Sequence, residues 1–264
     1  MSIQDYGRAG ETTAPSPSIW KDFPIAQALK TPGRYIHIWD DFEGGTAIDV
    51  AYSGKFEVVG TNADIDVIDD EINGVIYLAG SGADNDSSFL KSNVLYDLTM
   101  NNGKRFWFET RVKSVDVSLD HSLVAGLGEP AFCTAEGLAD GGATVIDEDF
   151  VGFAAFTDAT NMGGIDAIYN EGGSGTTSVE ADVHTPVDDT YVKLGLRFDG
   201  KKTLTYYVNG AVVCTVDVDD LSGNSLTNPL CVFVGMKDNE VSGFTAVMQL
   251  DWIRFACEKF ASGI

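Results

Sequence analysis

Apolar and polar residues alternate with a period of two along most of the chain after Arg34. In the segment 106–113, Phe106, Phe108 and Val112 fall on one face of an extended chain, whereas the odd-numbered residues, which are polar or amphipathic, fall on the other. Alternation of this kind is typical of a β-strand with one buried face. We therefore predict a strand at 106–113 with its even-numbered side chains in the core.

The clearest hairpin signal lies between residues 192 and 218. Apolar residues alternate in 192–198 and in 204–208, and the second run ends at Asn209-Gly210, a dipeptide strongly preferred in tight turns. A third run follows at once and places Val212, Cys214, Val216 and Val218 on one face. These runs predict an antiparallel meander of three strands.

Further strands are predicted where short apolar runs lie between glycine-rich turns. Glycine is abundant, at 29 residues, and the sequence lacks helical patterns of three turns. The fold class that follows is all-β, a two-sheet antiparallel jelly-roll sandwich, with short helices expected only at Phe23–Lys30 and Cys133–Ala139. The further predicted strands are Val75–Ala79, Leu123–Leu127, Phe150–Thr157, Ile165–Tyr169, Leu230–Met236 and Ala246–Ala256.

The first forty residues differ from the rest of the chain. They contain four of the 7 prolines, and the run 12–18 is typical of an extended, polyproline-like chain. Large apolar residues are scattered among them, which predicts that the segment docks on its own domain or on a neighbour. We therefore divide the chain into an extended N-terminal arm, residues 1–40, and a jelly-roll domain, residues 41–264. The candidate anchors of the arm are Trp20, Phe23, Ile25 and Leu29.

Four segments occur in an order known from one superfamily. They are 106–112 (Phe-Trp-Phe-Glu-Thr-Arg-Val), 192–200 (Val-Lys-Leu-Gly-Leu-Arg-Phe-Asp-Gly), 204–210 (Leu-Thr-Tyr-Tyr-Val-Asn-Gly) and 250–255 (Leu-Asp-Trp-Ile-Arg-Phe). Together they resemble the concanavalin A-like lectin and glucanase superfamily, especially its laminin-G-like branch. The resemblance spans about residues 40–258 and implies a lectin-like jelly roll, although a fold of this kind does not specify a function.

The charge of the chain restricts its partners. The formal net charge is −23, and the arm is neutral by count, so the excess lies in the domain. An acidic surface is repelled by nucleic acid and by anionic membranes, and we expect neither as a partner. The N-terminus lacks the pattern of a secretory signal, and no apolar run approaches the roughly 18 residues that span a bilayer. We expect a soluble protein made in a cytoplasm.

The cysteines do not define a metal site. Cys133, Cys214, Cys231 and Cys257 lack the spacing of zinc ligands. Cys214 and Cys231 fall inside predicted strands, where we interpret them as small buried apolar residues. Two disulfides remain an open alternative.

Catalytic patterns are weak. Glucanases of this superfamily carry Glu-x-Asp-x-(x)-Glu on one strand, and the nearest acidic run here, Asp64–Glu71, lacks that order and is interpreted as a solvated strand edge. No serine lies in a Gly-x-Ser-x-Gly elbow, and the histidines are His37, His121 and His184, of which His121 is interpreted as a surface or hydrogen-bonded residue rather than a catalytic one. We expect a protein that is not an enzyme.

Binding chemistry remains open. Calcium could be held by hard oxygen ligands in the runs 83–87 and 238–240, which are rich in Asp and Asn. A glycan could stack on Trp107, which shares the polar face of its strand with Glu109 and Arg111, whereas Trp39 and Trp252 are assigned to the core.

Two functional hypotheses follow. The first is a decoration (cement) protein on the capsid of a virus such as a bacteriophage, made in the host cytoplasm, which would grip the major capsid protein with its N-terminal arm. Laminin-G-like jelly rolls occur among phage head proteins, and a homotrimer would suit the local threefold positions of a shell. The alternative is a lectin-like carbohydrate-binding module, which could also lie on a virion surface, in which loops and Trp107 contact the glycan. A hydrolase whose carboxylates come from separate strands is the least favoured alternative.

Overall fold

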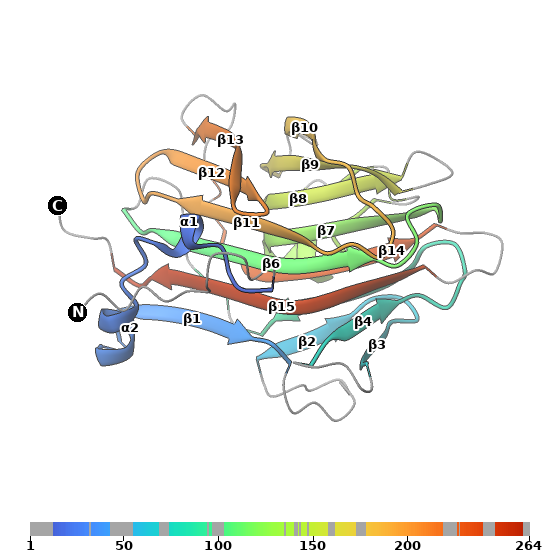
Figure 1. Cartoon of the computed structure of the whole chain (residues 1–264), viewed down its shortest axis with the longest axis horizontal. Helices are drawn as coiled ribbons and strands as arrows, with labels where there is room; N and C mark the ends of the chain where they lie inside the picture. Colours follow the sequence, from blue (N-terminus) through green and yellow to red (C-terminus); the bar gives the residue numbers. More distant parts are fainter. Residues whose placement is uncertain are drawn as a thin grey trace.

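A computed structural model describes residues 13–31, 33–42, 55–68, 74–93, 95–96, 103–134, 136–139, 142, 144–146, 148–157, 162–172, 178–218, 226, 228–239 and 246–260. Within these residues the chain forms two antiparallel sheets packed face to face (Figure 1). The all-β jelly-roll sandwich predicted from the alternation of apolar residues is therefore confirmed.

The eight-stranded sheet, which faces the viewer in Figure 1 and is called the front sheet below, contains the first and the last strand of the described chain. Its order is β13-β12-β11-β6-β15-β4-β3, and β1 also pairs with β15. The strands are β1 (Tyr35–Asp40), β3 (Asp64–Val67), β4 (Ile76–Ala79), β6 (Phe106–Ser114), β11 (Val192–Phe198), β12 (Thr203–Val208), β13 (Ala211–Asp217) and β15 (Val247–Glu258).

The seven-stranded sheet, called the back sheet below, has the order β10-β9-β8-β7-β14-β5-β2. Its strands are β2 (Phe56–Val59), β5 (Asp86–Ser92), β7 (His121–Gly128), β8 (Phe150–Thr157), β9 (Met162–Asn170), β10 (Ser178–His184) and β14 (Cys231–Asp238). The described helices are all short: α1 (Pro17–Trp20), α2 (Ile25–Lys30) and α3 (Pro130–Thr134). None of the described helices is long and apolar enough to cross a membrane.

The main core lies between the sheets. It takes Phe106, Phe108 and Val112 from β6, as the alternation predicted, and Leu194 and Leu196 from β11, all buried. Burial of such side chains supplies about 1.5–3 kcal/mol each, which makes this interlayer the principal source of stability.

The predicted meander is present, with one correction. Strand β11 pairs with β12 and β12 with β13, and Asn209 and Gly210 both have the positive φ of a tight hairpin turn. The β12–β13 register shifts at Tyr206 and Tyr207, which face Cys214 and Val212 respectively. The extra residue of this bulge turns Val212 away from the core face that Cys214 occupies. The prediction that Val212 and Cys214 lie on the same face is therefore wrong.

Most other predicted strands are confirmed, with ends that differ by a few residues. Strand β8 matches the prediction, and α2 and α3 overlap the predicted helices. Strands β1, β2, β5 and β10 were not predicted. The acidic run that begins at Asp64 is an edge strand, β3, up to Val67, in agreement with its interpretation; its residues 69–71 lie outside the described residues.

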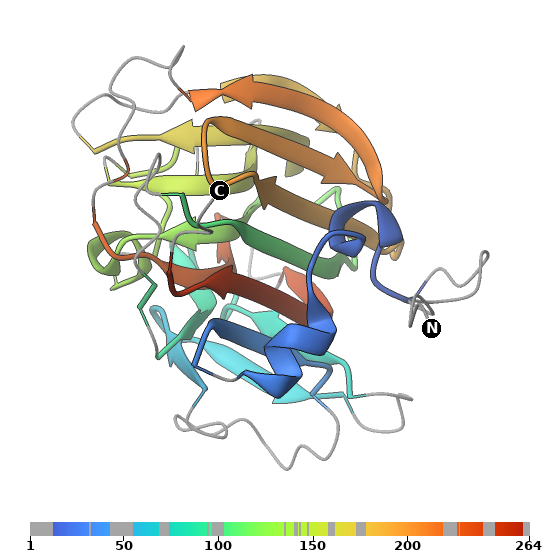
Figure 2. The ribbon, with the colours of Figure 1, turned by 90° about the vertical axis from the view of Figure 1, so that its left-hand side faces the viewer.

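The division of the chain at residue 40 needs correction. Strand β1 pairs with β15 along its whole length, from Tyr35 opposite Glu258 to Asp40 opposite Ile253. The segment before it is not an extended arm, because α1 and α2 fold it back against the front sheet (Figure 2). Residues 13–40 are therefore part of the domain; the first 12 residues lie outside the described residues.

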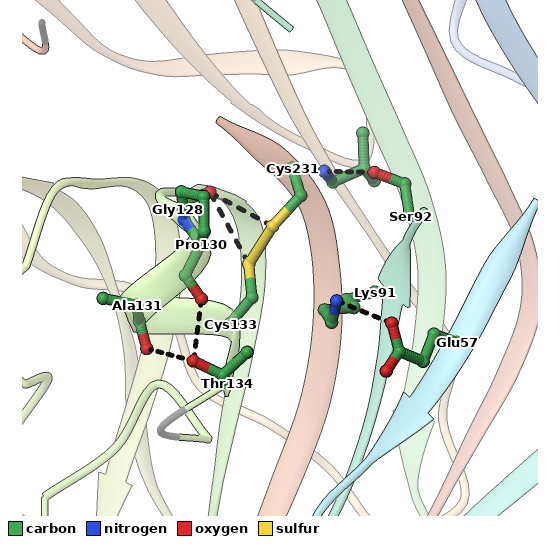
Figure 3. The surroundings of a disulfide bond; sticks show 10 residues. Glu57, Lys91, Ser92, Gly128, Pro130, Ala131, Cys133, Thr134 and Cys231 are labelled. Carbon is green, nitrogen blue, oxygen red and sulfur yellow. Dashed lines mark hydrogen bonds and ion pairs between the residues drawn. A yellow bond between two sulfur atoms is a disulfide. The ribbon is translucent and has the colours of Figure 1, made fainter. Parts of the chain in front are cut away.

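The outer face of the back sheet is also covered by the chain itself. The connection between β7 and β8 lies over it, and Phe132 of α3 stacks on Phe150 and meets Phe233 in a second buried cluster. A disulfide joins Cys133 of this connection to Cys231 of β14 (Figure 3). Cys231 is thus buried as predicted but paired. Among the other cysteines, Cys257 is buried and Cys214 is half-buried, and both are free thiols. Segments of the chain therefore cover part of each broad face of the sandwich.

Candidate functional site

Residues 13–23, called the strap below, lie on the outer face of the front sheet, where α1 crosses in front of β11 and β6 (Figure 1). Ile19, Trp20 and Phe23 of the strap are buried in a cluster with Trp107 and Tyr207 of the sheet. The local sequence explains the shape. Pro17 occupies the start of α1, where its missing N–H costs no hydrogen bond, and Pro24 separates α1 from α2.

A buried carboxylate holds the strap at its centre. Glu109 on β6 accepts hydrogen bonds from the backbone N–H of Ser16, at 2.9 Å to Oε2, and from the indole N–H of Trp20, at 2.8 Å. Burial raises the pKa of Glu109, and the donors from Ser16 and Trp20, together with the charge of Lys193, offset part of that rise. A carboxylate removed from water is tolerated only when donors satisfy it, so the strap and Glu109 depend on each other.

Two further indoles fasten the ends of the strap. Trp252 donates to the backbone oxygen of Thr13 at 2.8 Å, and Trp107 donates to Asp22 Oδ1 at 3.0 Å. Asp22 also forms an ion pair with Arg197. These contacts come from strands β15, β6 and β11, and they recognise particular groups of the strap rather than its general apolar character.

The sheet is shaped to receive the strap. A Cβ at Gly195 would lie 2.3 Å from Cδ1 of Ile19, so a side chain at this position on β11 requires Ile19 to move from its place in the strap. Ser18 donates to the backbone oxygen of Gly210 at 2.6 Å, in the turn between β12 and β13. Asp22, Gly195 and Ser18 were not identified from the sequence, because their importance depends on contacts between distant segments.

The structure brings together two predicted sites. The candidate arm anchors Trp20 and Phe23 are 2% and 5% exposed and pack on the predicted glycan platform, with the rings of Phe23 and Trp107 at 5.2 Å. Trp107 itself is 0% exposed. It therefore offers no ring face to a glycan in this structure. The prediction of Trp107 as a glycan platform is wrong here because the strap covers the ring. Of the other anchors, Ile25 is half-buried, whereas Leu29 is 68% exposed.

Arg111 lies beyond the strap on the same face. It pairs with Asp251, and its guanidinium lies 3.7 Å from the centre of the Tyr191 ring. Tyr191 is half-buried, and it is an aromatic ring that the sequence-based search for a platform missed. The two tryptophans assigned to the core belong to this outer layer: Trp252 is buried and Trp39 is half-buried.

One end of the sandwich gathers polar side chains from several connections. This loop end, on the right in Figure 1, comprises residues 80–85, 115–120 and 185–191 with the adjoining ends of β8 and β14. Asp188 accepts from the backbone N–H of Val117 at 2.7 Å, and Asp120 accepts from the hydroxyl of Thr157. Asp116, Ser118, Asp120 and Asp188 are all exposed or half-buried.

The two runs considered for calcium meet at this end. Asp86 and Asp238 are register partners on β5 and β14, and the N–H of Asn85 donates to the backbone oxygen of Asp238 at 2.8 Å. The carboxylate of Asp86 already accepts from Ser81 and Asn62, and these hydrogen bonds lower its pKa against the effect of burial. Within the described ranges no group of three or more His, Cys, Asp or Glu residues is arranged to hold a metal; Glu240 lies outside them.

His121 lies between the sheets near the loop end. Its ring nitrogens contact Ser114 Oγ and the backbone oxygen of Leu119, both at 2.9 Å, and it is 1% exposed. Burial lowers its pKa, which favours the neutral ring. The predicted hydrogen-bonded role is confirmed. Its place between two strands fits a structural part in closing the end of the core.

Comparison with known proteins identifies the fold. No protein-family model matches the sequence, and no curated protein is similar to it. Among solved structures, the carbohydrate recognition domain of Emp47p aligns with a TM-score of 0.55 at 12% identity, covering 83% of this chain and 93% of that one. Peanut lectin aligns at 0.51 with 16% identity over 84% and 97%. A protein of unknown function from Shewanella oneidensis MR-1 aligns at 0.57 with 12% identity over 90% and 96%. The fold is thus of the concanavalin A-like lectin type.

Proposed function

We propose that this chain is a non-catalytic carbohydrate-binding protein that recognises its ligand with the loop end. The observation that carries the proposal is the meeting of hydrogen-bonding side chains from separate connections at that end, Asp188 beside the β6–β7 turn and Asp120 beside Thr157. Carboxylates accept and hydroxyls donate or accept, which is the chemistry that a polyhydroxylated ligand requires.

The covered faces of the sandwich support this location. The strap covers part of the outer face of the front sheet, and the β7–β8 connection covers part of that of the back sheet. Tyr191, at the start of β11, adds a half-buried ring beside the loop end and replaces Trp107 as the candidate platform. The fold neighbours include a lectin and a carbohydrate recognition domain, which also supports a carbohydrate as the ligand class to test first.

A glycan array followed by titration calorimetry tests the proposal. Asp120→Asn keeps the oxygen that accepts from Thr157 and removes the charge, and we expect it to weaken glycan binding at least tenfold, since a hydrogen bond to a charged group contributes about 1.5–3 kcal/mol. The matched control is Asp217→Asn, a half-buried carboxylate paired with Lys202 at the opposite end, which should leave binding unchanged. Titrations with calcium and with a chelator decide whether the metal takes part. If no glycan binds in either condition, the proposal is wrong.

The strap favours a second candidate function, decoration of a viral capsid. A segment held by specific contacts, rather than by general apolar packing, is suited to gripping an identical neighbour on a shell. The partner would be the major capsid protein, the oligomer a trimer, and the location the virion surface. Density-gradient separation of a lysate from the native source tests this. Many copies travelling with virus-sized particles would support decoration, and recovery only in the low-mass fractions would refute it.

A further inference from the structure

The strap and the front sheet have the features of a peptide bound in a receptor site. The sheet supplies a carboxylate for two N–H donors, two indole donors, a cation for Asp22 and a glycine that admits Ile19. All of these contacts are made by residues 13–22. Nothing in their geometry requires that the strap and the sheet belong to the same molecule.

The connection between strap and sheet is a weak helix. Helix α2 has six residues, its N-cap Pro24 makes no side-chain capping bond, its C-cap Thr31 donates its backbone N–H to the oxygen of Gln27, and Ala28 is its one buried residue. Leu29 is 68% exposed. A helix this short has little stability of its own in water, because nucleation costs more than a few hydrogen bonds return.

The same connection is long enough to reach another molecule. Residues 24–34 link the end of the anchored strap to β1, and eleven residues in extended form span about 36 Å. Unfolding α2 exposes little additional apolar surface, since Leu29 is already in water. Exchange would keep every contact of the strap, and its main cost is that the strap no longer binds within its own chain. Such domain swapping is a low-cost route by which identical chains associate.

We propose that the front sheet is a binding site for the strap of a second copy of this chain, so that strap exchange joins neighbouring copies. The association is self-complementary, because each molecule offers one strap and one site. Exchange is favoured at high local protein concentration. Once one strap has bound the neighbouring copy, the second strap binds within the same complex at a high effective concentration. The proposal is independent of carbohydrate binding at the loop end.

Two variants of the full chain separate the strap from its site. Gly195→Val places a side chain where Ile19 lies, so it blocks the site while improving the strand propensity of β11, and its strap remains intact. Ile19→Ala/Trp20→Ala leaves the site open and removes the two buried anchors of the strap. Each variant alone should be monomeric, because one lacks a site and the other lacks a strap.

Mixing the two variants gives the test. We expect a one-to-one heterodimer by native mass spectrometry and light scattering, formed when the strap of the blocked copy enters the open site. A chain that carries all three substitutions is the control and should pair with neither. Absence of a heterodimer at protein concentrations of hundreds of micromolar, with both variants folded by circular dichroism, overturns the proposal.

A second measurement avoids substitution altogether. Unlabelled and ¹⁵N-labelled wild-type chains are mixed, held at high concentration and treated with a lysine crosslinker, and crosslinks between Lys21 of the strap and Lys193 of the sheet are sorted by isotope. Pairs of mixed isotope report exchange. Pairs confined to one isotope, after incubation for days, show that the strap stays on its own sheet and refute the proposal.

Discussion

Replacing Trp20 by phenylalanine isolates the hydrogen bond that holds the strap. The ring stays in the buried cluster with Phe23 and Trp39, while the 2.8 Å bond from the indole to Glu109 is lost. A hydrogen bond to a buried charge contributes about 1.5–3 kcal/mol, and the smaller ring adds about 1 kcal/mol. We expect a loss of about 3 kcal/mol at pH 7.5, which lowers Tm by about 6–12 °C for a domain of this size. Urea unfolding followed by tryptophan fluorescence measures it.

The pH dependence of this loss identifies Glu109 as its source. The pKa of Glu109 is raised by burial in the folded state, so the folded chain binds the proton more tightly than the unfolded chain. The contribution of this group to stability is therefore greatest below its unfolded pKa and declines as pH rises through the folded pKa. Without the indole donor the folded pKa rises further. The loss caused by Trp20→Phe should shrink to about 1.5–2.5 kcal/mol as the pH falls towards 4, because protonation of Glu109 leaves the indole bonded to a neutral oxygen.

Trp252→Phe is the matched control, since Trp252 donates to a neutral backbone oxygen of Thr13 over a similar distance, 2.8 Å. It should cost about 0.5–1.5 kcal/mol for the hydrogen bond, plus the smaller ring, with no change between pH 4 and pH 7.5. Equal, pH-independent losses for the two variants would refute the assignment of Glu109 as the group that holds the strap.

Three other outcomes follow from the packing. A Cβ at Gly235 would overlap the ring of Phe89, so Gly235→Ala should cost about 1–3 kcal/mol in urea unfolding, whereas Gly33→Ala, in open space, should change stability little. Burial lowers the pKa of His121, so the stability that its neutral ring gives is lost as pH falls from about 6.5; His121→Asn, which never becomes charged, should flatten the wild-type decline. The disulfide joins residues separated by 98 positions, so replacing both of its cysteines by serine should cost up to about 4–5 kcal/mol in the same assay.

The strands that could be predicted are those whose sequence signals lie within the strand and its adjoining turn. The meander 192–217 has alternating apolar residues on either side of an Asn-Gly turn, and neither signal needs knowledge of the rest of the chain. Strands β5 and β10 escaped prediction because polar residues interrupt the alternation, for example the buried Ser87 and Ser88. The bulge opposite Tyr206 and Tyr207 also has no sequence signature, and it changed the face of one residue.

The strap shows a different limit. The sequence indicated that its aromatic residues dock on something and that Trp107 lies on a polar strand face, and both statements hold. The sequence did not show that the aromatic residues of the strap dock on the strand face that carries Trp107. This match depends on strand register, which places Glu109 opposite Gly195 on β11 and Arg254 on β15. Pairings between residues that far apart in sequence cannot be read from local patterns.

The register also explains why this face needs a cover. On the outer face, Trp107 lies between Ala256 and Arg197, and Glu109 lies between Gly195 and Arg254, near the centre of the eight-stranded sheet. Because Gly195 and Ala256 are small, they leave space beside the indole of Trp107 and the carboxylate of Glu109. The strap fills this space with Ile19 and Trp20. Small residues beside an outward-facing indole and carboxylate are therefore evidence for a further layer. The chain supplies that layer from its own N-terminal segment, or, if straps exchange, from the segment of a neighbour.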